Sequence, residues 1–219
     1  MCGRYALNAT ATELIEHFKL LSSLDFGPRF NIAPTSQIPV IRHKPDTGRV
    51  AQLVRWGLIP SWAKDPSIGA KLNNARAETV AEKPSFRTSF ARHRCIIPAS
   101  GFYEWQTVAG KKQPFYIHPT APDTFFAFAG LLAAWKAPDG QTIVSTCIIT
   151  TAPNAVMEPI HDRMPVILQP EQFDVWLDQQ TPGPQEMLKP CNPDLMNAYP
   201  VRPLKSDGPE CIEAMDCGQ

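Results

Sequence analysis

Proline limits what this chain can fold into more than any other feature. Twenty-three prolines are spread over all 219 residues, roughly twice the usual share of about 5%. Each proline interrupts a helix because it lacks a backbone N–H donor. Long helices are therefore excluded almost everywhere. The prolines are not gathered in one stretch, so they divide the chain into short elements and form no polyproline linker.

Only short helical patterns remain between these prolines. A helix is expected to begin after Thr10, because Thr10 and Glu13 have the spacing of a capping box. The apolar side chains on one face of this helix are Leu14, Ile15, Phe18 and Leu21. Further helical patterns cover residues 171–179, a short stretch after Pro184, and residues 154–158.

Elsewhere the sequence favours short strands. Runs rich in β-branched and aromatic residues, bounded by Pro, Gly and Asp, cover 38–42, 50–56, 94–97, 114–118, 125–131, 142–150 and 165–168. The sequence has no internal repeat and no linker. We therefore predict an α+β fold: one domain over residues 1–219, with a curved, mixed or barrel-like β-sheet core flanked by short helices. The strand order does not follow from the pattern.

The charges are balanced overall but divided along the chain. Residues 1–169 hold 18 Lys and Arg against 12 Asp and Glu, whereas residues 170–219 hold 3 against 9. The first three quarters can therefore present a basic surface to a polyanion, or the charges can be ordinary surface scatter.

Several classes of protein are excluded or disfavoured. No secretory signal begins the sequence, and the longest apolar run, 125–135, is shorter than the roughly 20 residues of a membrane span. We expect a cytoplasmic protein without membrane contact. The six cysteines form no Cys-x-x-Cys pair, so reduced thiols are expected and no metal. Motifs for dinucleotides, nucleoside triphosphates and zinc hydrolysis are absent, and we predict no cofactor.

Cys2 is the residue whose chemistry is most distinctive. If Met1 is removed, Cys2 carries a free α-amine beside its thiol, which makes a 1,2-aminothiol. An α-amine has a pKa of about 7.7–8.0, so a useful fraction is nucleophilic at neutral pH. Such an amine condenses with an aldehyde, and the thiol can then close a five-membered thiazolidine ring. Alternatively, Cys2 has no role.

Two further residues have side chains suited to proton transfer. Glu104 stands between Tyr103 and Trp105 in a run typical of a buried strand, and burial would raise its pKa toward neutrality. It can equally belong to a buried ion pair. His161 lies at the edge of a predicted element, where an imidazole can face a cleft, although a lone histidine is often structural.

Other residues could bind an anion or a base. Asn74 and Arg76 alternate with alanines, so in an extended segment both side chains share one face. Arg4 and Arg163 follow Cys2 and His161 closely in the sequence and could extend an anionic site. Trp62 could be a stacking platform or a core residue.

Six motifs together resemble one family. They are MCGR at 1–4, RFNIAP at 29–34, WGLIPSW at 56–62, NARAET at 74–79, GFYEW at 101–105 and IHDRMP at 160–165. In this order, over residues 1–205, the chain resembles the SRAP family of SOS-response-associated peptidases, or abasic-site processing proteins. Where that family commonly has asparagines late in the chain, this sequence has VRPLKSD at 201–207.

The resemblance implies a protein of the DNA damage response that binds single-stranded DNA and captures the aldehyde of an abasic site. It implies that Cys2 forms the covalent thiazolidine cross-link, that Asn74 positions its amine, that Glu104 assists sugar opening, and that His161 is the acid–base partner. It further implies phosphate contacts by Arg4, Arg76 and Arg163, and a DNA cleft lined by Trp62 and Trp105. The protein would act as a monomer on the nucleoid. No protein partner follows from the sequence.

Two other functions stay open. A cysteine peptidase would use Cys2 as nucleophile, His161 as base and Glu104 to orient it, and could be limited to removing Met1. A non-covalent single-strand binder would use Trp62 and the arginines.

Overall fold

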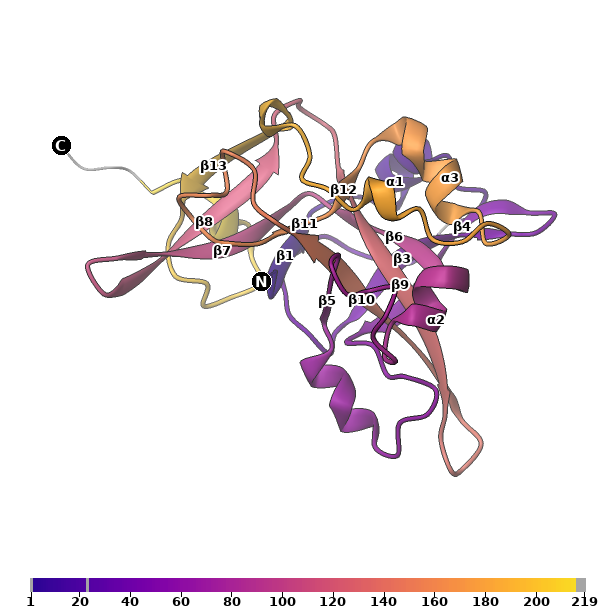
Figure 1. Cartoon of the computed structure of the whole chain (residues 1–219). Coiled ribbons are helices and arrows are strands. Elements are labelled where there is room, and N and C mark those ends of the chain that lie inside the picture. The colour runs from indigo at the N-terminus through magenta and orange to yellow at the C-terminus, as the bar shows by residue number, and fades with distance from the viewer. Residues whose placement is uncertain (1, 23, 216–219) are drawn as a thin grey trace.

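Two β-sheets organise the chain, and the larger one closes into a barrel (Figure 1). The computed structural model describes residues 2–22 and 24–215. The barrel strands are β3 (Gln37–Lys44), β4 (Gly48–Trp56), β6 (Arg94–Ala99), β9 (Phe126–Lys136) and β10 (Thr142–Thr151). The ring is closed because β10 pairs with β4 in parallel and with β9 in antiparallel orientation.

Three very short strands extend the barrel. They are β5 (Asn74–Arg76), β11 (Met164–Pro165) and β12 (Ile167–Leu168). The first two pair with β10 and the third with β9. The parallel β4–β10 and β5–β10 pairs make this sheet mixed.

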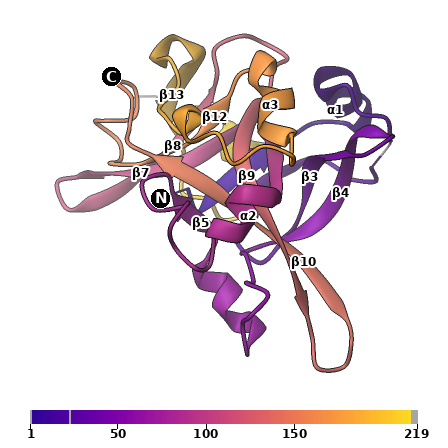
Figure 2. The same ribbon diagram turned by 45° about the vertical axis from the view of Figure 1, so that its right-hand side comes forward.

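The other sheet, called the first sheet because it contains β1, is antiparallel and has the order β13-β8-β7-β1-β2. Its strands are β1 (Arg4–Leu7), β2 (Arg29–Ile32), β7 (Gly101–Val108), β8 (Lys111–Pro119) and β13 (Met196–Pro200). The long β7–β8 hairpin projects at the left of Figure 1, away from the barrel. The start of β1 lies near β5 and β10, so the N-terminal segment meets the barrel there (Figures 1 and 2).

The helices are short, and α2 and α3 pack on the outside of the barrel. The α-helices are α1 (Ala11–Phe18), α2 (Arg87–Arg92) and α3 (Phe173–Leu177). The 3-10 helices are η1 (Pro66–Lys71), η2 (Pro170–Gln172), η3 (Gln185–Met187), η4 (Pro193–Leu195) and η5 (Pro209–Ile212). In Figure 2, α2 lies over β9, while α1 and α3 lie together, where Phe18 stacks on Phe173. The predicted α+β class with a barrel-like mixed sheet is confirmed.

The capping box at the start of α1 is confirmed. The Thr10 hydroxyl accepts the Glu13 N–H at 3.3 Å, and the Glu13 carboxylate accepts the Thr10 N–H at 2.7 Å. The predicted apolar face was wrong at Leu21, which is 69% exposed. The helix ends at Phe18 because Lys19 takes the left-handed conformation, with φ 54°, and the chain then leaves the helical path.

The predicted helix over residues 154–158 is also wrong. These residues form a turn, in which the Asn154 side chain accepts the Met157 N–H at 3.1 Å. Pro159 follows directly, and a proline disfavours helical backbone in the residue before it. This turn leads into His161.

Gly57 fixes the course of the chain after β4. Its φ is +120°, and a methyl group at this position would lie 2.5 Å from the Gly69 carbonyl oxygen. Only glycine allows both this backbone conformation and this close approach. The segment that carries Trp62 is thereby held against η1.

The core includes the apolar run that begins β9, whose residues 126–132 are all buried. Within the described ranges, no helix has the length and apolar character that crossing a membrane requires.

Candidate functional site

The four predicted catalytic residues come together where the first sheet meets the barrel. Cys2 lies two residues before the start of β1, Asn74 begins β5, Glu104 lies in β7, and His161 lies between the 154–160 turn and β11. They reach this place through strand pairing, because β1 pairs with β7, and β5 and β11 both pair with β10.

Cys2 is fixed at its carbonyl group by Asn74. The Asn74 Nδ2 donates to the Cys2 carbonyl oxygen at 2.9 Å, while the Asn74 Oδ1 is buried and accepts no hydrogen bond. The Cys2 side chain is fully buried. Burial raises the pKa of the Cys2 thiol far above its ordinary value, and the nearby Glu104 carboxylate raises it further. This thiol is therefore neutral at physiological pH.

Glu104 and His161 form a carboxylate–imidazole pair. The Glu104 Oε2 lies 3.7 Å from the His161 Nε2, and Glu104 is buried whereas a quarter of the His161 side chain is exposed. Burial raises the pKa of the Glu104 carboxyl, and the nearby His161 partly opposes this rise. A buried carboxyl with a raised pKa keeps its proton more readily than an exposed one, which suits a general acid.

Backbone contacts orient the His161 ring. Its Nδ1 accepts the Arg163 N–H at 3.0 Å, so we assign the tautomer that carries its proton on Nε2, toward Glu104. The exposed Asp162 carboxylate lies 2.9 Å from the same Nδ1. The two contacts exclude one another, because Asp162 can accept a bond from Nδ1 only when that nitrogen carries a proton.

The three predicted phosphate-binding arginines have different surroundings. Arg76 is exposed, whereas the Arg4 Nη1 donates to the Asn31 Oδ1 at 3.0 Å. Arg163 forms a two-pronged ion pair with Glu78, at 2.6 and 2.9 Å, and also donates to the Thr150 carbonyl. Because its Nη groups are engaged in this way, Arg163 is held in the structure more firmly than Arg76.

The two tryptophans differ as well. Trp62 is 57% exposed, so the alternative of core packing is wrong and its ring is available for stacking. Trp105 follows Glu104 on β7 and is half-buried against the aromatic cluster of the first sheet.

The sequence interpretation missed three positioning contacts. Glu78 pairs with Arg163, Asn31 holds Arg4, and the Gln106 amide donates to the Pro159 carbonyl at 2.9 Å, which ties β7 to the turn before His161. Asn31 and Glu78 lie inside the RFNIAP and NARAET motifs. Their place in these motifs singled them out, but the sequence did not indicate which residues they contact.

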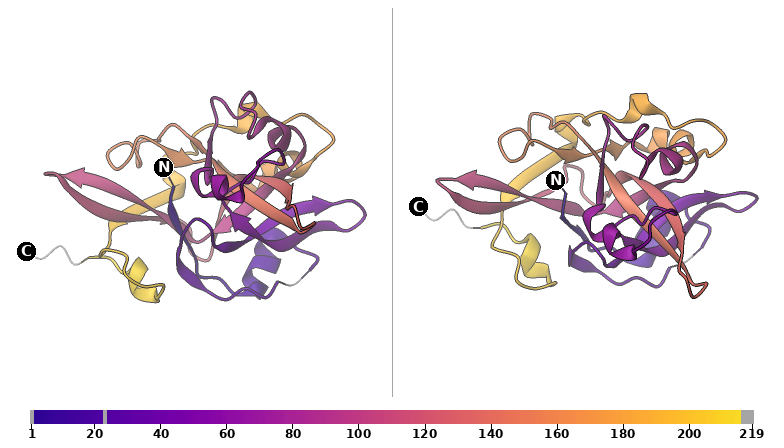
Figure 3. Two further views of the ribbon diagram at one scale, coloured as in Figure 1. Left: turned by 90° about the horizontal axis from the view of Figure 1, so that it is seen from below. Right: turned by 60° about the horizontal axis from the view of Figure 1, so that its bottom comes forward.

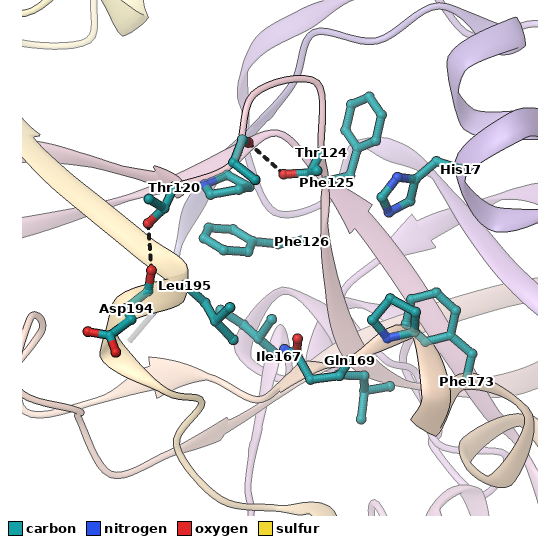
Figure 4. A pocket seen from close by; sticks show the side chains of 14 residues that line it. His17, Thr120, Thr124, Phe125, Phe126, Ile167, Gln169, Phe173, Asp194 and Leu195 are labelled. Atoms are coloured by element: carbon teal, nitrogen blue, oxygen red, sulfur yellow. Dashed lines mark hydrogen bonds between the residues drawn. The ribbon is translucent and has the colours of Figure 1, made fainter.

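A mainly apolar cavity lies elsewhere. It has a volume of about 360 Å³ and is lined by aromatic and aliphatic side chains of β9, β12 and α3 together with His17 of α1 (Figure 4). Phe125, Phe126 and Phe173 surround it, and it contains none of the nine predicted site residues.

Metal binding finds no support in residues 2–22 and 24–215, which hold no group of three or more His, Cys, Asp or Glu that could ligate an ion. Cys2, Cys95, Cys147, Cys191 and Cys211 are free thiols. Cys217 and Met1, whose removal the sequence predicts, lie outside the described residues.

The fold and the cluster together define a class of protein. Its barrel and its antiparallel sheet place four groups together: a cysteine that lies shortly before the first strand, an amide, a carboxylate and an imidazole. The model of one family, described as SOS response associated peptidase (SRAP), matches residues 1–205. The chain belongs to this family, and the resemblance drawn from its motifs is confirmed.

Individual proteins agree with this assignment. The abasic site processing protein YoqW of Bacillus subtilis (strain 168) is 44% identical, with 98% of this chain and 100% of that protein covered. The abasic site processing protein HMCES of Xenopus tropicalis is 33% identical, with 87% of this chain and 67% of that protein covered. A crystal structure of a Bacteroides thetaiotaomicron protein superposes with a TM-score of 0.89 at 27% identity, covering 98% of this chain and all of that one.

Proposed function

We propose that this protein binds single-stranded DNA and captures abasic sites covalently through Cys2 after Met1 is removed. The observation that carries the proposal is the placement of Cys2, whose carbonyl is held by Asn74 and whose thiol lies beside Glu104. The names of the relatives, abasic site processing proteins, support the same substrate. All four residues come from one chain, so a monomer suffices for the chemistry.

The first step is formation of a Schiff base. The Cys2 α-amine attacks the aldehyde carbon of the ring-opened abasic sugar, a C–N bond forms, and one water leaves. Glu104 and His161 supply the proton transfers that ring opening and dehydration require. The Asn74 Oδ1, which accepts no hydrogen bond in the structure, is suited to accept one from the amine.

The second step closes the ring. The Cys2 sulfur adds to the imine carbon, a C–S bond forms, and the thiol proton is transferred, by way of Glu104, to the imine nitrogen. The product is a thiazolidine, and no oxidant or cofactor is consumed. A thiol whose pKa is raised by burial is compatible with this order, because the amine makes the first attack.

The same neutral thiol argues against a general cysteine peptidase. That class attacks with a thiolate, and its sites lower the cysteine pKa with a neighbouring cation. Here burial and Glu104 act in the opposite direction. Turnover of a general peptide substrate would favour the peptidase over our proposal.

The direct test is a denaturing gel of Met1-free protein with a single-stranded oligonucleotide that carries one abasic site. We expect a heat-resistant shifted band whose intact mass is the sum of both molecules less one water. Cys2→Ala should abolish the band. Absence of any adduct, with Met1 shown to be removed, would overturn the proposal. If the same protein still shifts the oligonucleotide on a native gel, the simple single-strand binder is favoured.

Cys2→Ser separates the two steps. This variant keeps the amine and loses the thiol, so the Schiff base forms without ring closure and can undergo β-elimination. We expect strand nicking and no stable cross-link, observed on the same gel. A stable cross-link in Cys2→Ser would contradict the thiazolidine.

A further inference from the structure

The segment that follows β13 folds back onto the edge of the first sheet. The 3-10 helix η5 contacts β2, the last strand of that sheet. Figure 3 shows this C-terminal region, in yellow, beside the indigo start of the chain. The segment ahead of η5 holds Ser206 and Asp207, which make its polar contacts with β2.

Asp207 binds β2 with its whole carboxylate. Its Oδ1 accepts the N–H groups of Phe30 and Asn31, both at 2.7 Å, and its Oδ2 accepts the Arg29 Nε. Partial burial would raise the pKa of this carboxyl, but the hydrogen bonds from Arg29, Asn31 and Phe30 outweigh burial and lower it. Asp207 is therefore ionised at neutral pH.

The two N–H groups belong to an irregularity in the strand pairing. Tyr5 pairs with Ile32 and Leu7 with Arg29, so one residue of β1 faces two residues of β2, Phe30 and Asn31. A bulge of this kind leaves N–H groups out of the ladder and turns a side chain away from its regular direction. The Asp207 carboxylate satisfies both of these groups.

The side chain of the bulged Asn31 is held from both ends. Its Nδ2 donates to the Ser206 carbonyl at 2.6 Å, and its Oδ1 accepts the Arg4 Nη1 at 3.0 Å. The late segment thus fixes which way the Asn31 amide points, and the amide in turn fixes the Arg4 guanidinium. Arg4 lies two residues from Cys2 and pairs with Tyr103, the neighbour of Glu104.

We propose that Asp207 is a positioning residue for DNA binding, which aims Arg4 at a backbone phosphate of the bound strand by way of the β2 bulge and Asn31. This inference rests on the proposed function, because Arg4 is taken to meet DNA. It assigns a role to the segment that links β13 to η5.

The direction of the change in DNA affinity distinguishes this positioning role from a simple effect of charge. Asp207→Asn removes a negative charge near the basic site, which by itself would tighten the binding of a polyanion. A positioning role predicts weaker binding, because the amide cannot accept from both bulged N–H groups and Arg29 together. The two explanations therefore predict opposite changes in affinity.

The experiment measures the affinity of Met1-free protein for an intact single-stranded oligonucleotide without an abasic site, over a series of salt concentrations. We expect Asp207→Asn to bind about three- to tenfold more weakly at low salt, and its salt slope to fall toward that of Arg4→Ala, by up to about 0.7, the share of one phosphate contact. Asn31→Ala should behave alike. Unchanged or tighter binding by Asp207→Asn would overturn the inference.

Two controls remove a merely structural explanation. Asp174→Asn removes the same charge from another surface ion pair, with Arg49 on the barrel, and should leave DNA affinity unchanged. In an Arg4→Ala background, Asp207→Asn should cause no further loss, because its route of action is already gone. A further loss of the same size in that background would show that Asp207 acts on folding or on other contacts, and would overturn the inference.

Failure of the proposed function gives a different pattern. The reaction of the Cys2 aminothiol with free 2-deoxyribose needs no phosphate contact, so Asp207→Asn should form this small adduct at the wild-type rate. Wild-type protein that binds DNA yet forms no adduct with an abasic site contradicts the proposed capture alone. Wild-type capture combined with unaltered DNA binding in Asp207→Asn contradicts only the role of Asp207.

Discussion

At the scale of single residues, Glu104 has opposite effects on folding stability and on the proposed proton transfer. Its carboxyl group is buried and its pKa is raised, mainly by desolvation. A carboxyl whose pKa is higher in the folded than in the unfolded state favours folding while it is protonated. That contribution is complete at low pH and is lost as the pH rises through the folded pKa. Wherever the Glu104 carboxyl is ionised in the folded protein, it therefore costs stability.

Glu104→Gln should consequently separate the two properties. We expect capture of an abasic site to slow by about 100-fold or more, the usual contribution of a general acid or base, with single-strand affinity unchanged. The variant should melt at the same or a higher temperature than wild type at pH 7, and both should melt alike below about pH 4, where the carboxyl is protonated in both states. Single-turnover gels and thermal scans at several pH values measure this. Equal losses of affinity and capture would make Glu104 a binding or folding residue.

At the scale of elements, Gly57 joins β4 to the segment that carries Trp62. Gly57→Ala should destabilise the protein by about 2 kcal/mol or more, because it adds a clash with the Gly69 carbonyl to an unfavourable backbone conformation. Gly110→Ala is a matched control: Gly110 also has a positive φ, of +78°, but a methyl group there meets nothing within 4 Å. It should cost about 1 kcal/mol. Urea unfolding at 25 °C compares the two, and equal costs would show that the clash is relieved.

The elements that could be predicted are those whose signals are local. The capping box of α1 and the long apolar strands, such as β9 and β10, could be predicted because propensity and turn residues act over a few neighbours. Strands β2, β5 and β13 were missed because three to five residues carry little pattern, and their pairing with distant strands defines them. The closure of the barrel could not be predicted for the same reason.

The candidate site likewise combines residues that could be predicted with contacts that could not. Cys2 and Glu104 could be singled out by chemistry that is unusual in any context. The engagement of Arg163 by Glu78, and of Arg4 by Asn31, depends on strands that meet only in the folded chain. Residue type indicated which side chains could act, whereas tertiary contacts decide which are free to do so.

At the scale of the whole molecule, the division of charge should appear in the salt dependence of DNA binding. Each phosphate contact to a single strand contributes about 0.7 to the slope of log affinity against log salt concentration. Arg76 is exposed, so Arg76→Ala should lower the slope by about that amount. Arg163→Ala should lower it less and should mainly reduce thermal stability, because its partner Glu78 and the Thr150 carbonyl lose their donor. Titrations at four salt concentrations with each variant measure this, and a larger slope change for Arg163→Ala would contradict the assignment.

The pairing of β1 with β7 and of β5 with β10 also sets when the protein can act. These pairs join segments about 75 to 100 residues apart in the sequence, and chains dominated by such distant pairings fold over milliseconds to seconds. Until both sheets have formed, Cys2 lacks Asn74, Glu104 and His161, and a processed chain can react with an aldehyde only as a free peptide would. In a refolding experiment started by dilution from urea in the presence of abasic DNA, we expect cross-linking to lag behind mixing by the folding time. If Cys2 captures abasic sites as proposed, a newly made chain is therefore slow to trap aldehydes until its architecture is complete.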